Sequence, residues 1–104
     1  MKIQQSPRFK RDYKKLKNPK DIATTNAIIN ILIGFDTLYD VVLSPLKGIY
    51  HIEQKKGNLK EYYTARVNSK YRIIMKPIGT YPYNLIEIES IELIEINKDH
   101  YGGG

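Results

Sequence analysis

Hydrophobic residues near the start of the chain follow a helical spacing. Phe9, Tyr13 and Leu16 recur at i, i+4 and i+7, which places them on one stripe of a helix, and charged residues fill most positions between them. Ser6 and Pro7 predict where this helix begins, because serine is a favourable N-cap and proline suits the first helical position. The pattern therefore predicts an amphipathic helix with one face against a core.

A second helix is predicted directly after the first. Asn18 suits an N-cap and Pro19 the position after it, so we expect a helix over about residues 19–33 that ends near Gly34. This segment becomes more apolar toward its end, which predicts packing against a sheet. Its apolar positions are Ile22, Ile28, Ile29, Ile31, Leu32 and Ile33. Together the two helices predict an αα-hairpin with a very short turn.

The rest of the chain is typical of β-structure. Tyr, Ile, Val and Thr predominate, and the short connection Asn68-Ser69-Lys70 predicts a hairpin turn. The expected strands are residues 59–67, 71–76 and 83 to about 97, with a short first strand over residues 1–5 and a loop over 77–82. Pro45 and Gly48 make regular structure unfavourable across residues 35–48, which we expect to form an irregular crossover.

The last predicted strand does not alternate simply. Ile88, Ile94 and Ile96 would share a face with Ile86, whereas Ile91 and Leu93 fall on the other face among glutamates. A β-bulge near position 90, or burial of both faces, would explain this. The expected fold class is α+β, with two N-terminal helices packed as an αα-hairpin on one face of a small, mostly antiparallel sheet.

Length and composition restrict the kind of protein. A chain of 104 residues predicts a single domain spanning residues 1–104, since two domains could not each bury enough apolar surface. The absence of cysteine excludes disulfides, thiolate zinc sites and thiol nucleophiles. No signal sequence or membrane span is evident, so we expect a cytoplasmic protein with no membrane partner.

The charge of the chain indicates an acidic partner. Seventeen Lys and Arg against eleven Asp and Glu give a net charge of +6, which favours encounter with polyanions without specifying one. Eight basic residues and one acid, Asp12, lie from Lys2 to Lys20. The first helix contributes Arg11, Lys14 and Lys15, which are either a solvated face or phosphate contacts for RNA.

Four polar residues have the chemistry of metal-free RNA cleavage. In that reaction the 2′-hydroxyl attacks the adjacent phosphorus, so a protein must supply a base, an acid and positive charge for the phosphorane. His100 can act as acid or base near neutral pH, Glu53 is a complementary base, and Arg66 can bind phosphate oxygens with two donors. Tyr101 follows His100 directly, and no metal or cofactor is required.

Each of these residues also has an ordinary structural interpretation. His100 can be a solvated histidine near the end of the chain, and Glu53 one exposed acid among several; His51 is more typical of a surface residue than of a catalytic one. Arg72 either contacts RNA or only pairs with a carboxylate. Arg66 and Arg72 flank the hairpin turn, and the register decides whether they share a face. Tyrosines Tyr62, Tyr63 and Tyr101 could stack on unpaired bases.

A motif over residues 59–74 resembles the RelE/ParE superfamily of bacterial type II toxins, and the likeness extends over nearly the whole chain. The motif comprises Leu59, Tyr62-Tyr63, Arg66-Val67-Asn68 and Tyr71-Arg72. The ending His100-Tyr101 looks most like YoeB-type and HigB-type mRNA endonucleases. The chain departs from the YoeB-like pattern in three places. It has Ala65 where the pattern prefers arginine and Tyr63 where the pattern prefers tryptophan, and it adds the tail Gly102-Gly103-Gly104.

The resemblance implies a specific function. Glu53, Arg66 and His100 would be catalytic, Tyr101 would shape the site, and Lys56 would contact RNA. The implied protein is a type II toxin that enters the ribosomal A site, cuts mRNA without a metal or cofactor, and is held inactive by a cognate antitoxin. Two alternatives remain: a ParE-like toxin that inhibits DNA gyrase without nuclease activity, and a non-catalytic RNA-binding module.

Overall fold

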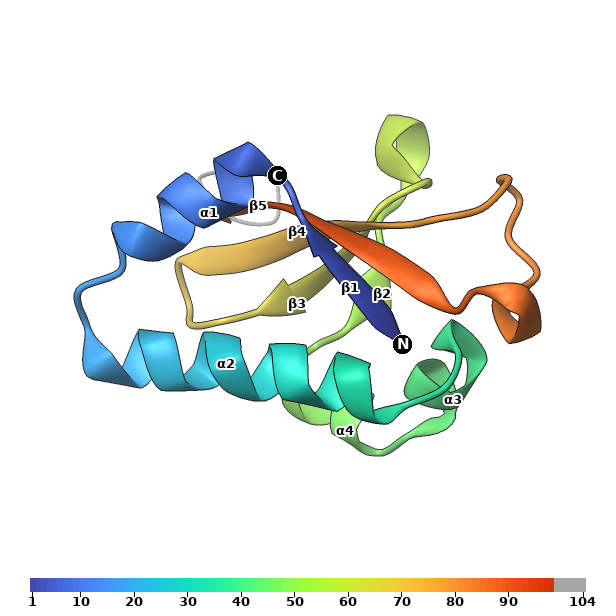
Figure 1. Ribbon diagram of the computed structural model, residues 1–104, viewed down its shortest axis with the longest axis horizontal. Coiled ribbons are helices and arrows are strands. Elements are labelled where there is room, and N and C mark those ends of the chain that lie inside the picture. The colour runs from blue at the N-terminus through green and yellow to red at the C-terminus, as the bar shows by residue number, and fades with distance from the viewer. Residues whose placement is uncertain (99–104) are drawn as a thin grey trace.

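A computed structural model describes residues 1–98 of the chain, and residues 99–104 lie outside the described part (Figure 1). The helices are α1 (Pro7–Lys14), α2 (Pro19–Gly34), α3 (Leu38–Leu43) and α4 (Leu46–Ile49). The strands are β1 (Lys2–Gln5), β2 (Glu53–Gln54), β3 (Tyr63–Arg66), β4 (Tyr71–Pro77) and β5 (Ser90–Lys98). Single 3₁₀ turns, Gly57–Leu59 and Leu85–Glu87, precede β3 and β5.

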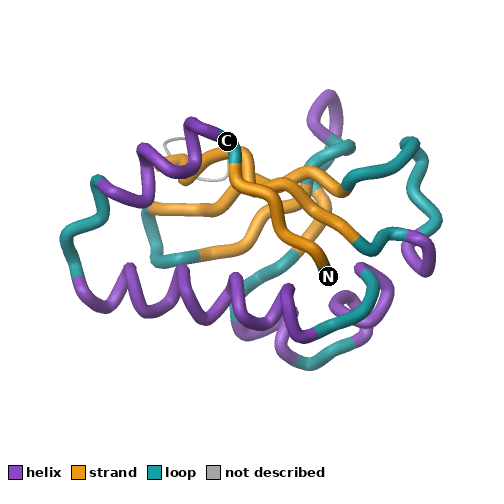
Figure 2. The backbone as a smooth tube through the Cα atoms, in the orientation of Figure 1, coloured by secondary structure: helices purple, strands orange, loops and turns teal. Residues whose placement is uncertain are grey.

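The strands form one mixed sheet with the order β1-β5-β4-β3-β2. β1 runs parallel to β5, and the other neighbouring pairs are antiparallel. Figure 2 shows α2 running across the sheet and α1 beside β5. The expected α+β class, with an N-terminal helix pair and a mostly antiparallel sheet, is confirmed.

Both predicted helix starts are confirmed by their capping contacts. The Ser6 hydroxyl accepts the Phe9 N–H at 3.0 Å, and the Asn18 side-chain oxygen accepts the Lys20 N–H at 2.9 Å. A proline follows each cap at the first helical position, where a missing N–H costs nothing. These starts depend on neighbours in sequence only, so local sequence was enough to predict them.

α2 contributes the main helical part of the core. Ile28 and Leu32 are fully buried and belong to one cluster with Ile73, Met75 and Ile91 of the sheet. The C-terminal end of this helix is held by the start of the chain, since the Met1 α-amino group donates to the carbonyl oxygens of residues 32, 33 and 35. No helix within residues 1–98 is long and apolar enough to cross a membrane.

A β-bulge in β5 accounts for its irregular alternation. Ile74 pairs with Glu95 whereas the next residue, Met75, pairs with Leu93, so the ladder skips Ile94. The skipped residue moves Ile96 to the same buried side as Leu93. The bulge was expected near position 90, which was wrong, because its position depends on pairing with β4.

The bulge is also where α1 attaches to the sheet. The Ser6 N–H donates to the Leu93 carbonyl oxygen, and the Ser6 hydroxyl donates to the Ile94 carbonyl oxygen. Ser6 directly follows β1, so these contacts mark the point where the pairing of β1 with β5 ends and α1 begins. Further along, the Asp12 carboxylate accepts the Ile96 N–H at 3.0 Å. A side chain of α1 therefore satisfies a backbone donor where β1 no longer pairs with β5.

Several predicted boundaries were wrong. Residues 35–48 are not irregular, since they contain α3 and the start of α4. The Thr37 side chain caps α3, and Pro45 stands at the start of α4, where proline is tolerated. β3 begins at residue 63 and β5 at residue 90, later than residues 59 and 83, because 3₁₀ turns occupy the intervening segments. β2 was not predicted, since two residues are too few for a periodic signal.

Candidate active site

The strand register brings three of the predicted site residues onto one face of the sheet. Arg66 of β3 pairs directly with Arg72 of β4, and Glu53 of β2 pairs with Thr64 of β3. Residues opposite one another share a face, as do residues two apart in a strand. The face that carries both arginines and Glu53 is therefore the one opposite the core residues Ala65 and Ile73.

Glu53 and Arg72 lie within ion-pair distance. Arg72 Nη1 is 4.0 Å from Glu53 Oε1, and the side chains are 21% and 66% exposed respectively. The Arg66 guanidinium forms no ion pair or side-chain hydrogen bond with the described part of the chain, whereas its backbone N–H donates to the Tyr50 carbonyl. The site thus combines an accessible carboxylate with one paired guanidinium and one available to a ligand.

β2 is positioned by a sharp turn after α4. His51 has a left-handed φ of 48°, and the following Ile52 N–H donates to the Lys47 carbonyl at 2.8 Å. Ile52 is 3% exposed, so its side chain anchors the segment in the core. Glu53, the next residue, is consequently held at the sheet edge, while His51 is an exposed turn residue.

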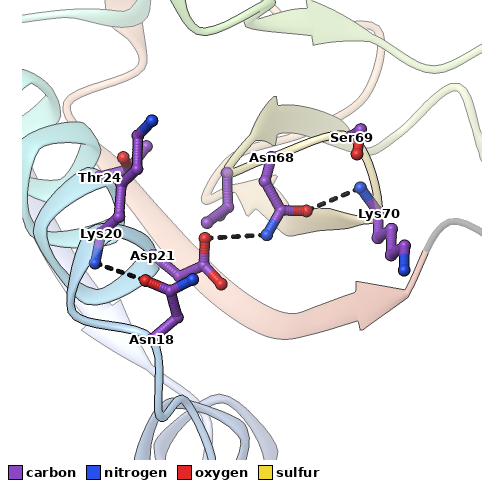
Figure 3. Close-up of a pocket in the computed structure, with 8 residues that line it drawn as sticks. Asn18, Lys20, Asp21, Thr24, Asn68, Ser69 and Lys70 are labelled. Atoms are coloured by element: carbon purple, nitrogen blue, oxygen red, sulfur yellow. Dashed lines mark hydrogen bonds between the residues drawn. The ribbon is translucent and has the colours of Figure 1, made fainter.

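The turn between β3 and β4 is organised by the asparagine of the motif. The Asn68 side-chain oxygen accepts the N–H groups of Lys70 and Tyr71 at 2.7 and 2.8 Å, and its amide donates to Asp21 Oδ1 at 2.9 Å. Figure 3 shows the contacts of Asn68 with Asp21 and Lys70, and a surface cavity of about 350 Å³ lies beside them, between the start of α2 and the turn. Asn68 therefore connects the turn to α2 and supports the pairing of Arg66 with Arg72.

The other predicted RNA-binding residues lie outside the strands β2, β3 and β4. Lys56 is exposed just before a 3₁₀ turn, two residues after β2 ends. Arg11, Lys14 and Lys15 are exposed on or beside α1, which packs along β5, whereas Glu53 is on the edge strand β2, three strands away. The α1 cations therefore lie near β5 and not near β2.

His100 and Tyr101 lie outside the described residues, so their catalytic roles stay predictions. The described part of β5 ends at Lys98, which pairs with Tyr71, the neighbour of Arg72. Among residues 1–98, no three or more His, Cys, Asp or Glu side chains are grouped in a way that could hold a metal ion.

The same face carries a cation that sequence reasoning missed. Lys76 follows Arg72 and Ile74 at two-residue intervals in β4, so the three side chains share a face. Its Nζ is 4.0 Å from Glu61 Oε1 and 5.8 Å from the centre of the Tyr62 ring. Its even spacing of four residues from Arg72 within a predicted strand was visible in the sequence and could have identified it.

Known structures resemble this fold over almost its whole length. YafQ from E. coli strain BL21(DE3) has a TM-score of 0.65 and 22% identity, covering 98% of this chain and 97% of that one. A YoeB/ParE toxin from Agrobacterium tumefaciens gives 0.64 and 17%, covering 96% and 100%. The heterotetrameric YoeB–YefM toxin–antitoxin complex from Staphylococcus aureus gives 0.61 and 24%, covering 97% and 98%. No family model and no curated protein matches the chain. At these identities the likeness shows a shared fold.

Proposed function

We propose that this chain, which has the fold of the YoeB, YafQ and RelE toxins, is the toxin of a type II toxin–antitoxin system and a ribosome-dependent mRNA endonuclease. One observation carries the proposal: Glu53, Arg66 and Arg72 lie on the same face of the sheet, opposite the core residues Ala65 and Ile73. A general base and two phosphate-binding groups in one place are what cleavage through the 2′-hydroxyl needs.

The residues would divide the reaction as follows. Glu53 and His100 form the acid–base pair, one removing the proton of the 2′-hydroxyl and the other protonating the leaving 5′-oxygen. The products are a 2′,3′-cyclic phosphate and a free 5′-hydroxyl. Arg66 offers the developing phosphorane two donors, and Arg72 holds Glu53 while adding positive charge. Tyr101 shapes the site, and no metal or cofactor takes part.

The proposed partners follow from the surface and from the related structures. The ribosomal A site and its mRNA supply phosphates for Lys56 and for the basic residues Arg11, Lys14 and Lys15 of the α1 region. A cognate antitoxin would bind and neutralise the protein; YoeB and YefM of Staphylococcus aureus form a heterotetrameric toxin–antitoxin complex. Such a toxin acts in the cytoplasm, where the ribosomes are.

The direct test is primer extension on a reporter mRNA in a translating extract. The wild-type chain should produce ribosome-dependent cuts, and Arg66→Ala should reduce their rate by about 10²- to 10³-fold, the usual cost of removing a transition-state donor. Arg66→Lys should restore only part of the rate, because lysine cannot form the two-donor fork. Lys2→Ala, which removes a cation from the opposite edge of the sheet, is the charge-matched control.

The acid–base roles are tested in the same assay. Glu53→Gln and His100→Ala should each slow cleavage by about 10²- to 10⁴-fold. Cleavage that persists at the wild-type rate in both variants would contradict the mechanism. Inhibition of DNA supercoiling without RNA cleavage would indicate instead a toxin that inhibits DNA gyrase. Toxicity that is insensitive to His100→Ala yet lost on charge reversal of α1 would indicate a non-catalytic RNA-binding module.

A further inference from the structure

Apart from the candidate active site, a cluster of tyrosines lies where β4 ends and β3 begins. Tyr81 and Tyr83, in the loop after β4, contact each other edge to face, with ring centres 5.3 Å apart and planes at 86°. The Tyr83 hydroxyl donates to the Glu61 carbonyl at 2.7 Å, which joins this loop to the segment before β3. The loop is thereby held beside Tyr62, the residue before β3.

Lysines accompany two of these rings. Lys60 Nζ lies 5.6 Å from the centre of the Tyr81 ring, and Lys76 Nζ lies 5.8 Å from the centre of the Tyr62 ring. Both distances are within the range of cation–π contacts. Lys60 is exposed, and the Lys76 side chain is 40% exposed, so both cations reach solvent even though Glu61 pairs with the latter.

Two of the tyrosines here, Tyr63 and Tyr83, hold their protons more tightly than a free tyrosine does. Burial raises the pKa of Tyr83, as does the nearby Glu61 carboxylate, and burial also raises the pKa of Tyr63 beside them. Tyr62 and Tyr81 are only partly buried, so ring surface remains accessible. A partly exposed aromatic ring next to a lysine is suited to binding a base on a negatively charged strand.

The cluster continues the face that holds the candidate active site. Tyr62 immediately precedes β3 and Arg66 is its last residue, so the two are four residues apart, or about 13 Å along an extended chain. Lys76, which lies beside the Tyr62 ring, is on the face of β4 that carries Arg72, so this ring and the arginines are on the same side of the sheet. That distance corresponds to a few nucleotides of a single strand.

We propose that Tyr62 and Tyr81, with Lys60 and Lys76, form a binding site for unpaired RNA bases that flank the cleaved phosphodiester. That the ligand is RNA follows from the nuclease function proposed above, on which this inference rests. Each ring stacks on a base and each lysine contacts the adjoining phosphate. A site of this type tolerates any base, because every base has an aromatic face. It would hold the message in line with Arg66 and Glu53.

Binding of free RNA to the full chain tests this site separately from catalysis. The probe is a short single-stranded RNA with 2′-O-methyl riboses, which cannot react through the 2′-hydroxyl, and a matched RNA has its bases removed. The wild-type chain should bind the intact RNA more tightly. Tyr81→Leu and Tyr62→Leu should each weaken that binding by about 5- to 150-fold, the usual range for one base–aromatic stack.

Three controls make the outcome decisive. Tyr81→Phe and Tyr62→Phe keep the ring and should keep the affinity, and Tyr39→Leu removes a tyrosine that is 41% exposed on α3. Equal binding of intact and base-free RNA, no measurable binding by the wild-type chain, or unchanged affinity in both leucine variants would overturn the proposal. The loss of cleavage expected for Arg66→Ala would stand in each of those cases, so the two proposals fail independently.

Discussion

Replacement of Asn68 by alanine should weaken both the fold and the site. The substitution removes two acceptor contacts to the turn N–H groups of Lys70 and Tyr71, and a donor contact to the Asp21 carboxylate in the first turn of α2. The turn would then have no side chain to hold its backbone and no connection to α2. Arg66 and Arg72, which pair across this turn, would lose a constraint on their register.

The expected cost can be worked out from these contacts. A neutral hydrogen bond contributes about 0.5–1.5 kcal/mol and one to a charged group about 1.5–3 kcal/mol. Lys70 is exposed and Asn68 only partly buried, so water replaces part of what is lost. We expect Asn68→Ala to lower the free energy of unfolding by about 2–3 kcal/mol, which corresponds to a fall in Tm of about 10–20 °C.

Urea unfolding followed by circular dichroism measures this effect, and a double-mutant cycle with Asp21→Ala isolates the contact to α2. Asn68→Asp is the sharper comparison, because aspartate keeps the acceptor for the turn but places a second carboxylate against Asp21. It should therefore be destabilising, and Asp21→Asn should rescue it. A change below about 0.5 kcal/mol in Asn68→Ala, or no coupling in the cycle, would refute the structural role of this asparagine.

Three further predictions concern stability and use the same urea titration. Asp12→Ala should cost about 1.5–3 kcal/mol, because it leaves the Ile96 N–H without an acceptor, and Asp12→Asn should recover most of the loss. Thr25→Val should gain about 1 kcal/mol, because the Thr25 hydroxyl is buried without a partner within residues 1–98. Burial raises the pKa of Tyr63 and Tyr83, so the folded state holds these protons more tightly than the unfolded state does. The free energy of unfolding should therefore fall as the pH rises above about 10. Phenylalanine at both positions should reduce this dependence on pH. An unchanged unfolding free energy would count against the first two, and an unchanged alkaline slope against the third.

Features that depend on neighbours in sequence were predictable. Ser6-Pro7 and Asn18-Pro19 specified where α1 and α2 begin, since a capping side chain and the N–H it accepts are only two or three residues apart. The turn at Asn68 was predicted for the same reason. Pro45 was misleading, because proline is compatible with the start of a short helix as well as with a loop.

Features that depend on strand pairing were not predictable. Periodicity showed that β5 had to be irregular, but the bulge lies at Ile94 because Met75 pairs with Leu93. The proximity of Lys60 to Tyr81 is also decided by a loop that returns to the segment before β3. Nothing in the spacing of those two residues indicates it.

In the candidate site, too, some features depend on the sequence alone and others on strand pairing. The sequence by itself determined the chemistry of the site, namely a carboxylate and arginines around a hairpin turn in a basic chain, because residue identity sets charge and hydrogen-bonding capacity. Only the tertiary structure decided that Glu53, Arg66 and Arg72 share one face. The reason is physical: a shift of one residue in register would move a side chain to the other face, and register is chosen by the packing of the whole sheet.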